Sequence, residues 1–318
     1  SDVSEIPQGR SKIVVTPRSV SRSDEMQCHL GMVAFSSLEA GSFTFGGWIA
    51  KEIDQIALTA VRCVRAALMV SVIAGFAGQL TRKALRASWR YLLLGGLFGS
   101  YFVLMFEGLK TAHPVSTAAV FTLTPVMAAG FGWVIMGQIT NRRMALALVF
   151  GAVGALWVIF RGDLAAFLAF DIGVGEVIFF VGCIAHALYI PLVPRLNRGE
   201  GVFAFALGTM VGGAILVGAL GAPRIVETDW AALPVLVWAV LAYLVIFASV
   251  ASISLIQFAS MRLKAAKVMA YTYLIPSWVI LWELALVRDV PPLVMSPGVG
   301  LTILALVMLL REGAVSRP

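Results

Sequence analysis

Long apolar runs separated by short polar joins repeat along the chain after a polar segment at residues 1–28. A membrane-spanning helix needs about 17–25 mostly apolar residues. The joins carry turn-forming residues and are too short to form a soluble domain. The pattern therefore predicts an all-α membrane protein with ten transmembrane helices. We place them near residues 29–50, 57–79, 89–109, 115–137, 143–161, 171–193, 202–221, 232–257, 268–287 and 295–310.

Two stretches of the chain, residues 106–138 and 258–289, share one internal pattern. In each, an aromatic residue is followed four positions later by a base, and a proline is followed thirteen positions later by a polar residue. Each half of the chain holds five predicted helices, and an odd number reverses the direction in which the second half enters the membrane. We therefore expect two inverted five-helix repeats, at residues 29–161 and 171–311. The matching residues are Phe106, Lys110, Pro125 and Gln138 in the first copy, and Phe258, Arg262, Pro276 and Asp289 in the second.

The distribution of basic residues predicts the orientation. Loops on the cytoplasmic side of membrane proteins carry an excess of Lys and Arg. With the N-terminal segment inside, seventeen of the 24 bases lie on the inner side and five on the outer side, while Arg62 and Arg65 lie within a span. We therefore expect both termini to be cytoplasmic and residues 1–28 to form a flexible cytoplasmic tail. That segment has no apolar stretch followed by a cleavage site, so it does not read as a signal peptide.

Composition supports the same class of protein. Hydrophobic residues make up 60% of the chain and charged residues 13%, against about 45–50% and about 25% in soluble proteins. In this setting the net charge of +7 reflects the inner loops and does not indicate nucleic-acid binding. Cys28, Cys63 and Cys183 show neither metal-ligand spacing nor a disulfide framework, so we expect buried thiols. Phosphate-loop, zinc-protease and nucleophile-elbow motifs do not occur in the sequence, so we expect no cofactor, no metal and no enzyme activity.

The chain resembles the drug/metabolite transporter superfamily, and within it the EamA-type ten-span carriers, over residues 29–311. The two proline-containing stretches carry most of the resemblance, with Leu58–Arg62 and Gly175-Glu176 as further matches. Where that family commonly has Leu-Gly-Glu, this chain has Met136-Gly137-Gln138 and Val287-Arg288-Asp289, so no role of that glutamate carries over. The resemblance implies a bacterial-type inner-membrane carrier similar to amino-acid and metabolite exporters, with the substrate near the midplane.

Two ionisable side chains lie at matching depths in the first and sixth predicted spans. Charged groups inside a membrane are costly, and they usually face a cavity or a partner. Glu39 and His186 lie near the middle of their spans, and inverted symmetry places them where they can meet across the repeat axis. Either they bind a substrate ammonium or carry a coupling proton, or they form a hydrogen bond that holds the two halves together.

Arg62 and Arg65 lie one helical turn apart and are expected to share a face near the outer end of the second span. A guanidinium binds a carboxylate through two parallel hydrogen bonds, which makes Arg62 a candidate for binding a substrate carboxylate. The alternative is that Arg62 pairs with Glu52 or Asp54 and extends to the membrane interface.

Pro125 and Pro276 interrupt the fourth and ninth spans, and we interpret them as hinges or as bends that shape the cavity. Hydroxyl and aromatic side chains beside them are expected to line the substrate site. The aromatic face of the ninth span favours an aromatic amino acid as substrate. These candidates are Thr122, Thr124, Tyr271, Thr272, Tyr273 and Trp278.

The sequence thus predicts a secondary transporter for a small amphipathic metabolite, which exports it by alternating access. The expected partners are this small-molecule substrate and membrane lipid, with proton coupling as an option and a monomer or homodimer as the assembly. The alternatives are an uncoupled facilitator or channel, a non-transporting receptor or scaffold, and an integral-membrane enzyme.

Overall fold

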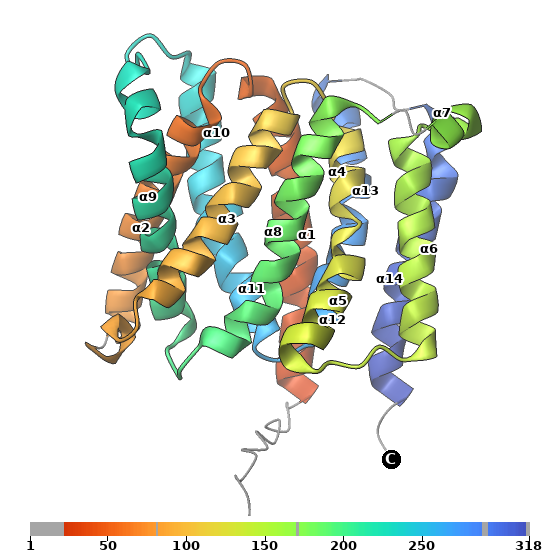
Figure 1. Ribbon diagram of the computed structural model, residues 1–318, viewed down its shortest axis with the longest axis horizontal. Helices are drawn as coiled ribbons and strands as arrows, with labels where there is room; N and C mark the ends of the chain where they lie inside the picture. The colour runs from red at the N-terminus through yellow and green to blue at the C-terminus, as the bar shows by residue number, and fades with distance from the viewer. Residues whose placement is uncertain (1–21, 81, 170–171, 288–291, 316–318) are drawn as a thin grey trace, which may run out of the picture.

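A computed structural model describes residues 22–80, 82–169, 172–287 and 292–315, and every regular element in these ranges is helical. The helices lie side by side as one elongated bundle (Figure 1). Three short elements, η1 (Arg82–Leu85), α7 (Leu164–Ala169) and η5 (Leu293–Met295), lie in or beside the joins. The long elements are α1 (Arg22–Ile49), α2 (Gln55–Phe76), α3 (Trp89–Gly108), α4 (Pro114–Phe121) followed by α5 (Thr124–Met136), α6 (Arg142–Ile159), α8 (Val174–Leu196), α9 (Val202–Glu227), α10 (Val235–Val245) followed by η2 (Ile246–Ala251) and α11 (Ser252–Ser260), α12 (Ala265–Ala270) followed by η3 (Tyr271–Leu274), α13 (Ile275–Trp282) and η4 (Glu283–Val287), and α14 (Ser296–Val315).

Nine helical segments in the described ranges are long and apolar enough to cross a membrane, and α1 is not among them. Helix α1 carries Ser36, Glu39, Ser42 and Thr44, all buried. It runs through the centre of the bundle (Figure 1), in contact with α4, α10, α11 and α13. Neighbouring helices shield its polar residues from lipid, so this span does not have to be as apolar as the others. The described ranges therefore contain nine segments that hydropathy identifies and a tenth that crosses inside them.

The two halves of the chain have opposite directions. Helix α1 begins at the end of the bundle where the C-terminal helix α14 finishes, whereas α8, which opens the second half, begins at the opposite end (Figure 1). Helix contacts follow the same symmetry, because two helices of the first half each pack on their counterpart in the second half: α2 on α9, and α6 on α14. The fold is the expected pair of inverted five-helix repeats. Helix α1 begins at Arg22, seven residues before the expected start of the first span.

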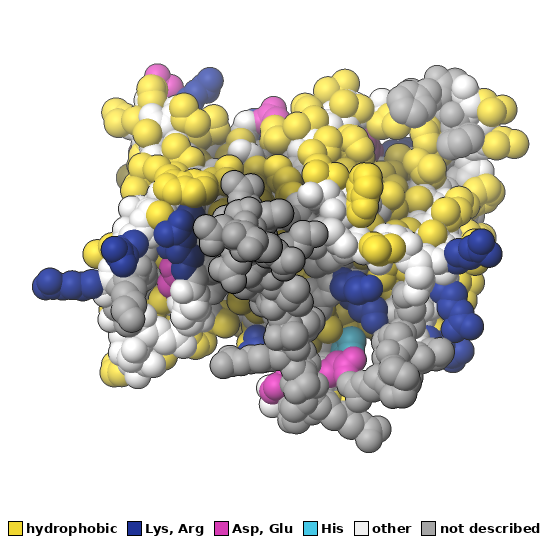
Figure 2. Space-filling model, turned by 60° about the horizontal axis from the view of Figure 1, so that its bottom comes forward, with side chains coloured by type: hydrophobic (Ala, Val, Ile, Leu, Met, Phe, Trp, Pro, Cys, Tyr) yellow, Lys and Arg dark blue, Asp and Glu magenta, His cyan; other side chains and the backbone are white. Residues whose placement is uncertain are grey.

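Basic side chains gather at the end of the bundle that carries both termini. Figure 2 looks toward this end and shows Lys and Arg side chains around it, with apolar side chains on the flanks. Arg142 and Arg143 in the first turn of α6, Arg195 in the last turn of α8 and Arg198 in the join after it lie at this end, whereas Lys51, Lys110, Arg161 and Arg224 lie near the other end. Arg288 and Asp289 lie outside the described residues, as do residues 1–21.

Small residues bring α3 and α9 into close contact. A Cβ atom added at Gly95 would collide with the backbone of Gly212 and Gly213, and one added at Gly212 would collide with the backbone of Tyr91. Such small-residue pairs allow helices to pack with their backbones in contact. The three cysteines are free and buried, as expected.

The fourth and ninth spans are interrupted, and the prolines lie just after the interruptions. Helix α4 ends at Phe121, and Pro125 occupies the first turn of α5. Likewise Pro276 occupies the first turn of α13, after the 3₁₀ turn η3. The first turn of a helix has no internal partner for its N–H groups, so a proline there costs no hydrogen bond. Each of these spans therefore consists of a helix that stops and starts again, with the proline at the restart.

Candidate functional site

Arg62 of α2 lies completely buried inside the bundle. Its Nε donates a hydrogen bond to Ser249 Oγ at 2.5 Å, and its Nη2 donates to the Ala248 carbonyl oxygen at 2.6 Å. The guanidinium lies 3.5 Å above the centre of the Phe102 ring. The third nitrogen, Nη1, is buried and has no hydrogen-bond partner among the described residues. Arg62 is therefore held firmly, with one of its three nitrogens left without a partner.

The carbonyl that binds Arg62 belongs to a π-helical segment, η2. In a π-helix the hydrogen bonds run from residue i to i+5, and the change of register leaves backbone groups free for other partners. Such segments are frequent at functional sites. The serines of η2 and α11, Ser249 and Ser252, are both buried and face this region. The interruption of the eighth span thus supplies a hydroxyl and a carbonyl at the middle of the membrane.

Glu39 of α1 lies beside this arrangement, with 2% of its surface exposed. Its polar neighbours are the Arg62 guanidinium and the Ser252 hydroxyl. One carboxylate oxygen, Oε2, has no hydrogen-bond partner among the described residues. A buried polar atom is normally hydrogen-bonded. A carboxylate and a guanidinium therefore lie within electrostatic range of each other, each with one unused polar atom.

His186 of α8 lies near the same place but contacts aromatic rings. The centre of its ring is 4.4 Å from that of Tyr101 and 5.2 Å from that of Phe121. Neither ring nitrogen has a hydrogen-bond partner among the described residues. The expected Glu39–His186 pair is not formed, because the polar neighbours of Glu39 are Arg62 and Ser252. Tyr101 is near both groups: its ring contacts that of His186 at a tilt of 41°, and it is within electrostatic range of Glu39.

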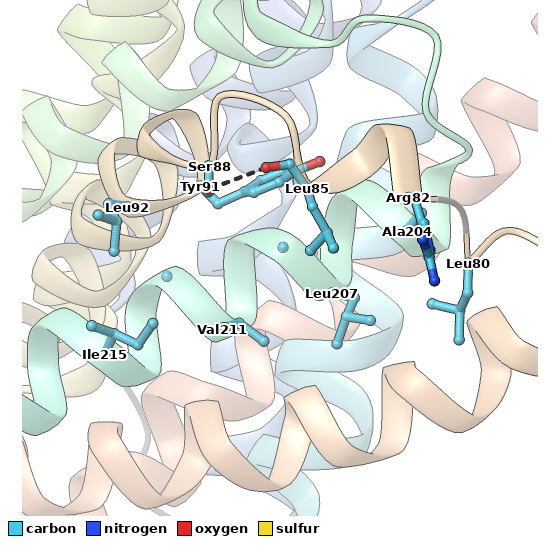
Figure 3. A pocket seen from close by; sticks show the side chains of 12 residues that line it. Leu80, Arg82, Leu85, Ser88, Tyr91, Leu92, Ala204, Leu207, Val211 and Ile215 are labelled. Carbon is cyan, nitrogen blue, oxygen red and sulfur yellow. Dashed lines mark hydrogen bonds between the residues drawn. The ribbon is translucent and has the colours of Figure 1, made fainter.

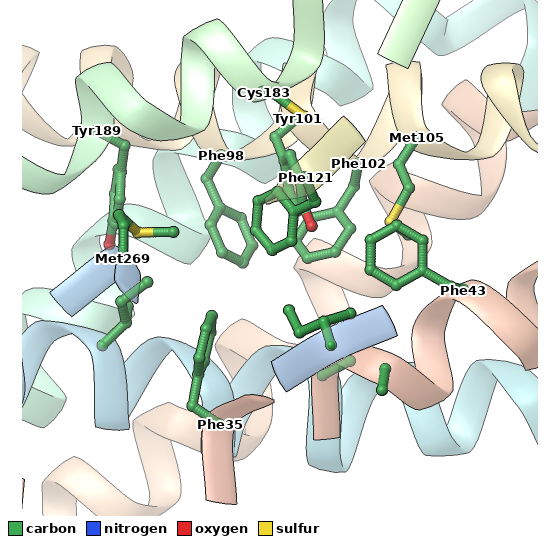
Figure 4. Close-up of a cluster of buried hydrophobic side chains, with 14 of the residues drawn as sticks. Phe35, Phe43, Phe98, Tyr101, Phe102, Met105, Phe121, Cys183, Tyr189 and Met269 are labelled. Atoms are coloured by element: carbon green, nitrogen blue, oxygen red, sulfur yellow. The ribbon is translucent and has the colours of Figure 1, made fainter. Parts of the chain in front are cut away.

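Aromatic side chains from α1, α3 and α4 gather in the buried core next to Arg62, whose guanidinium lies over the Phe102 ring. Figure 4 shows Phe35 and Phe43 with Phe98, Phe102 and Phe121, and the Tyr101 hydroxyl among the rings. All of these side chains are at most 3% exposed. Aromatic walls with a few polar groups are typical of sites for small amphipathic molecules.

The candidates of the ninth span do not form one face. The Tyr271 hydroxyl lies 2.5 Å from His29 Nδ1, near the end that carries the termini, and Tyr273 packs against Gly151 of α6. The Trp278 indole N–H donates to Ser36 Oγ at 3.2 Å, and its ring lines a groove of about 380 Å³ with Tyr243 and Trp282. These side chains point in three directions, so the predicted aromatic face of this span is wrong.

The predicted hydroxyls of the fourth span mostly bond to their own helix. Thr122 Oγ1 donates to the Ala119 carbonyl and Thr124 Oγ1 to the Phe121 carbonyl, both at 2.6 Å. Thr124 also lies 3.4 Å from Thr272 Oγ1. The two hydroxyls thus bond to backbone carbonyl oxygens at the end of α4, where the helix no longer supplies N–H partners for them. The Thr124–Thr272 contact also brings the two interrupted spans together.

Two expectations about charged residues near the far end were wrong. Arg62 and Arg65 do not share a face, because Arg62 is buried and Arg65 is exposed over the Trp238 ring, 5.2 Å from its centre. Nor does Arg62 pair with Asp54. Asp54 caps α2 by accepting from the backbone N–H groups of Ile56 and Ala57, and Arg224 lies 3.9 Å from its other oxygen.

A cavity of about 520 Å³ lies away from this cluster, between α3 and α9 (Figure 3). Its walls are mostly leucine, valine and isoleucine side chains, with Arg82 at one end. Tyr91, whose hydroxyl lies 3.4 Å from Glu200, is part of the wall. This cavity lacks the convergent polar groups of the Glu39–Arg62 cluster, so we place the candidate site at the cluster.

Sequence reasoning missed Tyr101, Phe102, Ser249 and Ser252. A usable signal was present in the eighth span, where two serines interrupt the apolar segment that contains η2. Serine in an apolar span often hydrogen-bonds across helices. The aromatic residues of the third span gave no such signal, because aromatic residues in an apolar run are normally core residues.

Known proteins place the chain in a family. A profile of the EamA-like transporter family matches residues 26–160 and again residues 173–311. An uncharacterized transporter of Bacillus subtilis (strain 168), YyaM, is 25% identical over 228 residues, which cover 71% of this chain and 74% of that protein. A solved crystal structure superposes with a TM-score of 0.69 at 18% identity, over 92% of this chain and 99% of that one. The profile matches both halves, and its family comprises transporters and not enzymes, so the chain belongs to the EamA-like transporter family.

Proposed function

We propose that this transporter exports a small zwitterionic metabolite of the amino-acid type, with an aromatic side chain, by alternating access about the Glu39–Arg62 cluster. One observation carries the proposal: a buried carboxylate and a buried guanidinium each keep one unpartnered polar atom, Glu39 Oε2 and Arg62 Nη1. An amino acid offers an ammonium to the first and a carboxylate to the second. Each contact is a charge-assisted hydrogen bond, which is stronger than a neutral one.

The surroundings support an amphipathic substrate. Phe102 lies under the Arg62 guanidinium and belongs to one buried core with Phe35, Phe43, Phe98 and Phe121, and aromatic rings stack well on an aromatic side chain. The low dielectric of such a site strengthens interactions between charges. A zwitterion entering it brings both charges together, so neither Glu39 nor Arg62 is left without a counter-charge.

Alternating access follows from the inverted repeats. Residues from both halves build the site, with Glu39 and Arg62 on the first and Ser249 on the second. Rocking of one half against the other opens such a site to each side in turn. The excess of basic residues at the end with both termini favours a cytoplasmic location for that end, and we infer a bacterial-type inner membrane. Glu39 is the group we propose for proton coupling.

The test is counterflow of labelled phenylalanine in liposomes containing the purified protein. Unlabelled phenylalanine is expected to compete. Its methyl ester, which lacks the free carboxylate, and 3-phenylpropionate, which lacks the amine, are expected not to compete. Threonine and an aliphatic polyamine extend the series to a polar side chain and to a substrate without a carboxylate. Equal competition by the ester, or exchange of the polyamine alone, would refute recognition of a zwitterion.

Coupling is tested in the same liposomes at two pH gradients. Exchange that rises with the gradient in the wild type, and no longer does so in Glu39→Gln, is the expected result. Exchange that ignores the gradient in both proteins would make the chain an uncoupled facilitator. Glu39→Asp is the matched variant, because it keeps the carboxylate and shortens the side chain by one methylene.

A further inference from the structure

Two buried polar side chains beside the Glu39–Arg62 cluster are left without hydrogen-bond partners among the described residues. His186 is 2% exposed, and both Nδ1 and Nε2 are unpartnered. Tyr101 is 0% exposed, and its hydroxyl is also unpartnered. Buried polar groups in proteins are nearly always hydrogen-bonded, so each exception needs an explanation. Two exceptions in contact with each other indicate a place where a polar group of a ligand binds.

The part of the chain that the structure describes offers these atoms no alternative partner. The rings of Tyr101 and His186 are in contact, with centres 4.4 Å apart and planes tilted by 41°, and Phe121 stands edge-on to His186 at 5.2 Å. Tyr189 lies one turn further along α8, with its ring centre 6.1 Å from that of His186. Its hydroxyl accepts a hydrogen bond from Gln257 Nε2 at 2.9 Å. Because its hydroxyl is already paired, Tyr189 does not explain the free nitrogens of His186.

Tyr101 connects this pair to the proposed head-group site. It lies within electrostatic range of both Glu39 and Arg62, while its ring contacts that of His186. A substrate whose ammonium and carboxylate are held by Glu39 and Arg62 therefore has its side chain beside Tyr101. His186 lies on the other side of this contact, where the ring of Phe121 also packs against it.

The unpartnered atoms define the chemistry of the missing group. A neutral imidazole has one donor and one acceptor, and a tyrosine hydroxyl has one donor and two acceptor lone pairs. A phenolic hydroxyl also both donates and accepts, so it pairs with His186 and Tyr101 together. We propose that Tyr101 and His186 form a side-chain subsite that selects a substrate whose aromatic ring carries a hydroxyl group. This subsite rests on the proposed function, since the head group must first be held by Glu39 and Arg62.

Selection follows from what happens when the hydroxyl is absent. A site built to hydrogen-bond a hydroxyl rejects the analogue that lacks it, because its own buried polar groups then stay unpaired. Tyrosine and phenylalanine differ in this one group. We therefore expect the protein to prefer tyrosine over phenylalanine by about tenfold or more.

The experiment measures how tyrosine and phenylalanine each compete with labelled tyrosine in counterflow. For the wild type we expect half-inhibition by tyrosine at a concentration about tenfold lower than by phenylalanine. His186→Phe is expected to reduce this ratio to about twofold or less while phenylalanine exchange continues. Tyr189→Phe is the matched control on the same helix, because its hydroxyl is already paired, and it is expected to keep the ratio.

A second pair of variants guards against a folding defect. Tyr101→Phe removes one hydroxyl and keeps the ring, so it is expected to lower the preference for tyrosine without loss of folded protein. His186→Gln retains a donor and an acceptor and is expected to restore part of the preference.

Three results would overturn the proposed subsite. Equal competition by tyrosine and phenylalanine in the wild type refutes the subsite alone, because exchange still occurs. Equal loss of both exchange reactions in monodisperse His186→Phe and Tyr101→Phe makes these residues structural. If the wild type exchanges neither amino acid, the proposed function and the subsite fall together.

Discussion

The hydroxyl oxygens of Thr124 and Thr272 lie 3.4 Å apart, at the point where the two interrupted spans meet. Both side chains are completely buried. Thr124 lies at the start of α5 and Thr272 in the 3₁₀ turn between α12 and α13. Helices α5 and α12 pack on each other, so each repeat presents its interruption to the other. A relative rotation of the two halves would have its pivot in this region.

Replacing Pro125 or Pro276 with alanine is expected to slow exchange more than it lowers the yield of folded protein. A proline in the first turn restricts the residue before it and prevents the preceding helix from running on. Alanine permits a continuous helix and so removes the proposed hinge. We expect counterflow to fall about tenfold and the melting temperature to stay near that of the wild type. Pro223→Ala, within α9, is the control; equal losses of exchange and yield would make the hinge prolines structural.

Arg62→Lys is expected to impair both exchange and stability, although it keeps the charge. Lysine has no planar fork of donors, so it cannot replace the bonds to Ser249 and to the Ala248 carbonyl together. Each unsatisfied buried group costs about 1–3 kcal/mol. Thermal unfolding in detergent and counterflow measure the two effects. Arg65→Lys, one turn along the same helix and exposed, is expected to match the wild type; an Arg62→Lys protein that also does so would remove Arg62 from the site.

Much of the fold was accessible from sequence because lipid imposes a simple requirement. A span exposed to lipid must be apolar for about 17–25 residues, and the predicted boundaries of α2, α3 and α6 agree with the structure within a few residues. The start of α1 was less well predicted. Its first turns, from Arg22, are polar, and polar residues at the end of a helix carry no signal of where the helix begins.

The candidate site was only partly predictable. Glu39, His186 and Arg62 stood out because charged or polar groups are rare inside spans. Their partners did not, because pairing depends on how the helices are rotated about their axes. Arg62 and Arg65 differ by three positions, yet one side chain is buried and the other is exposed. The π-helical register of η2, which supplies the Ala248 carbonyl, also has no sequence signature that we recognise.

Gly212→Ala is expected to destabilise the protein strongly, because the new methyl group would meet the backbone of Tyr91 at the contact between α3 and α9. The helices would have to separate, with loss of packing along this interface. The matched control is Gly218→Ala in the same helix, where a Cβ atom meets nothing within 4 Å. There alanine is expected to be neutral or to stabilise the helix by up to about 1 kcal/mol. Melting temperatures and yields after purification distinguish the two; equal behaviour would contradict the close contact.

Glu200→Gln is expected to lower stability at neutral pH but not in acid. Glu200 lies in the join between α8 and α9, and it accepts hydrogen bonds from Arg90 Nη2 and from the Arg198 backbone N–H, both at 2.6 Å. Burial raises the pKa of this carboxyl, but these hydrogen bonds outweigh burial, so its pKa is lower than usual. A lowered pKa means that the ionised form stabilises the fold. That contribution is complete above the ordinary pKa of glutamate and is lost as the pH falls through the lowered value.

The measurement is the difference in melting temperature between the wild type and Glu200→Gln across this pH range. We expect the difference to be largest near neutral pH and to shrink as the pH falls through the lowered pKa of Glu200, where the wild-type carboxyl takes up a proton and resembles glutamine. Glu227→Gln, at the exposed end of α9, controls for the loss of a surface charge. The guanidinium of Arg90 is fully buried, so the loss of its counter-charge leaves a buried cation paired only with carbonyl oxygens, Leu196 among them. A difference that does not change with pH would show that shape and hydrogen bonding, and not charge, hold this join against α3.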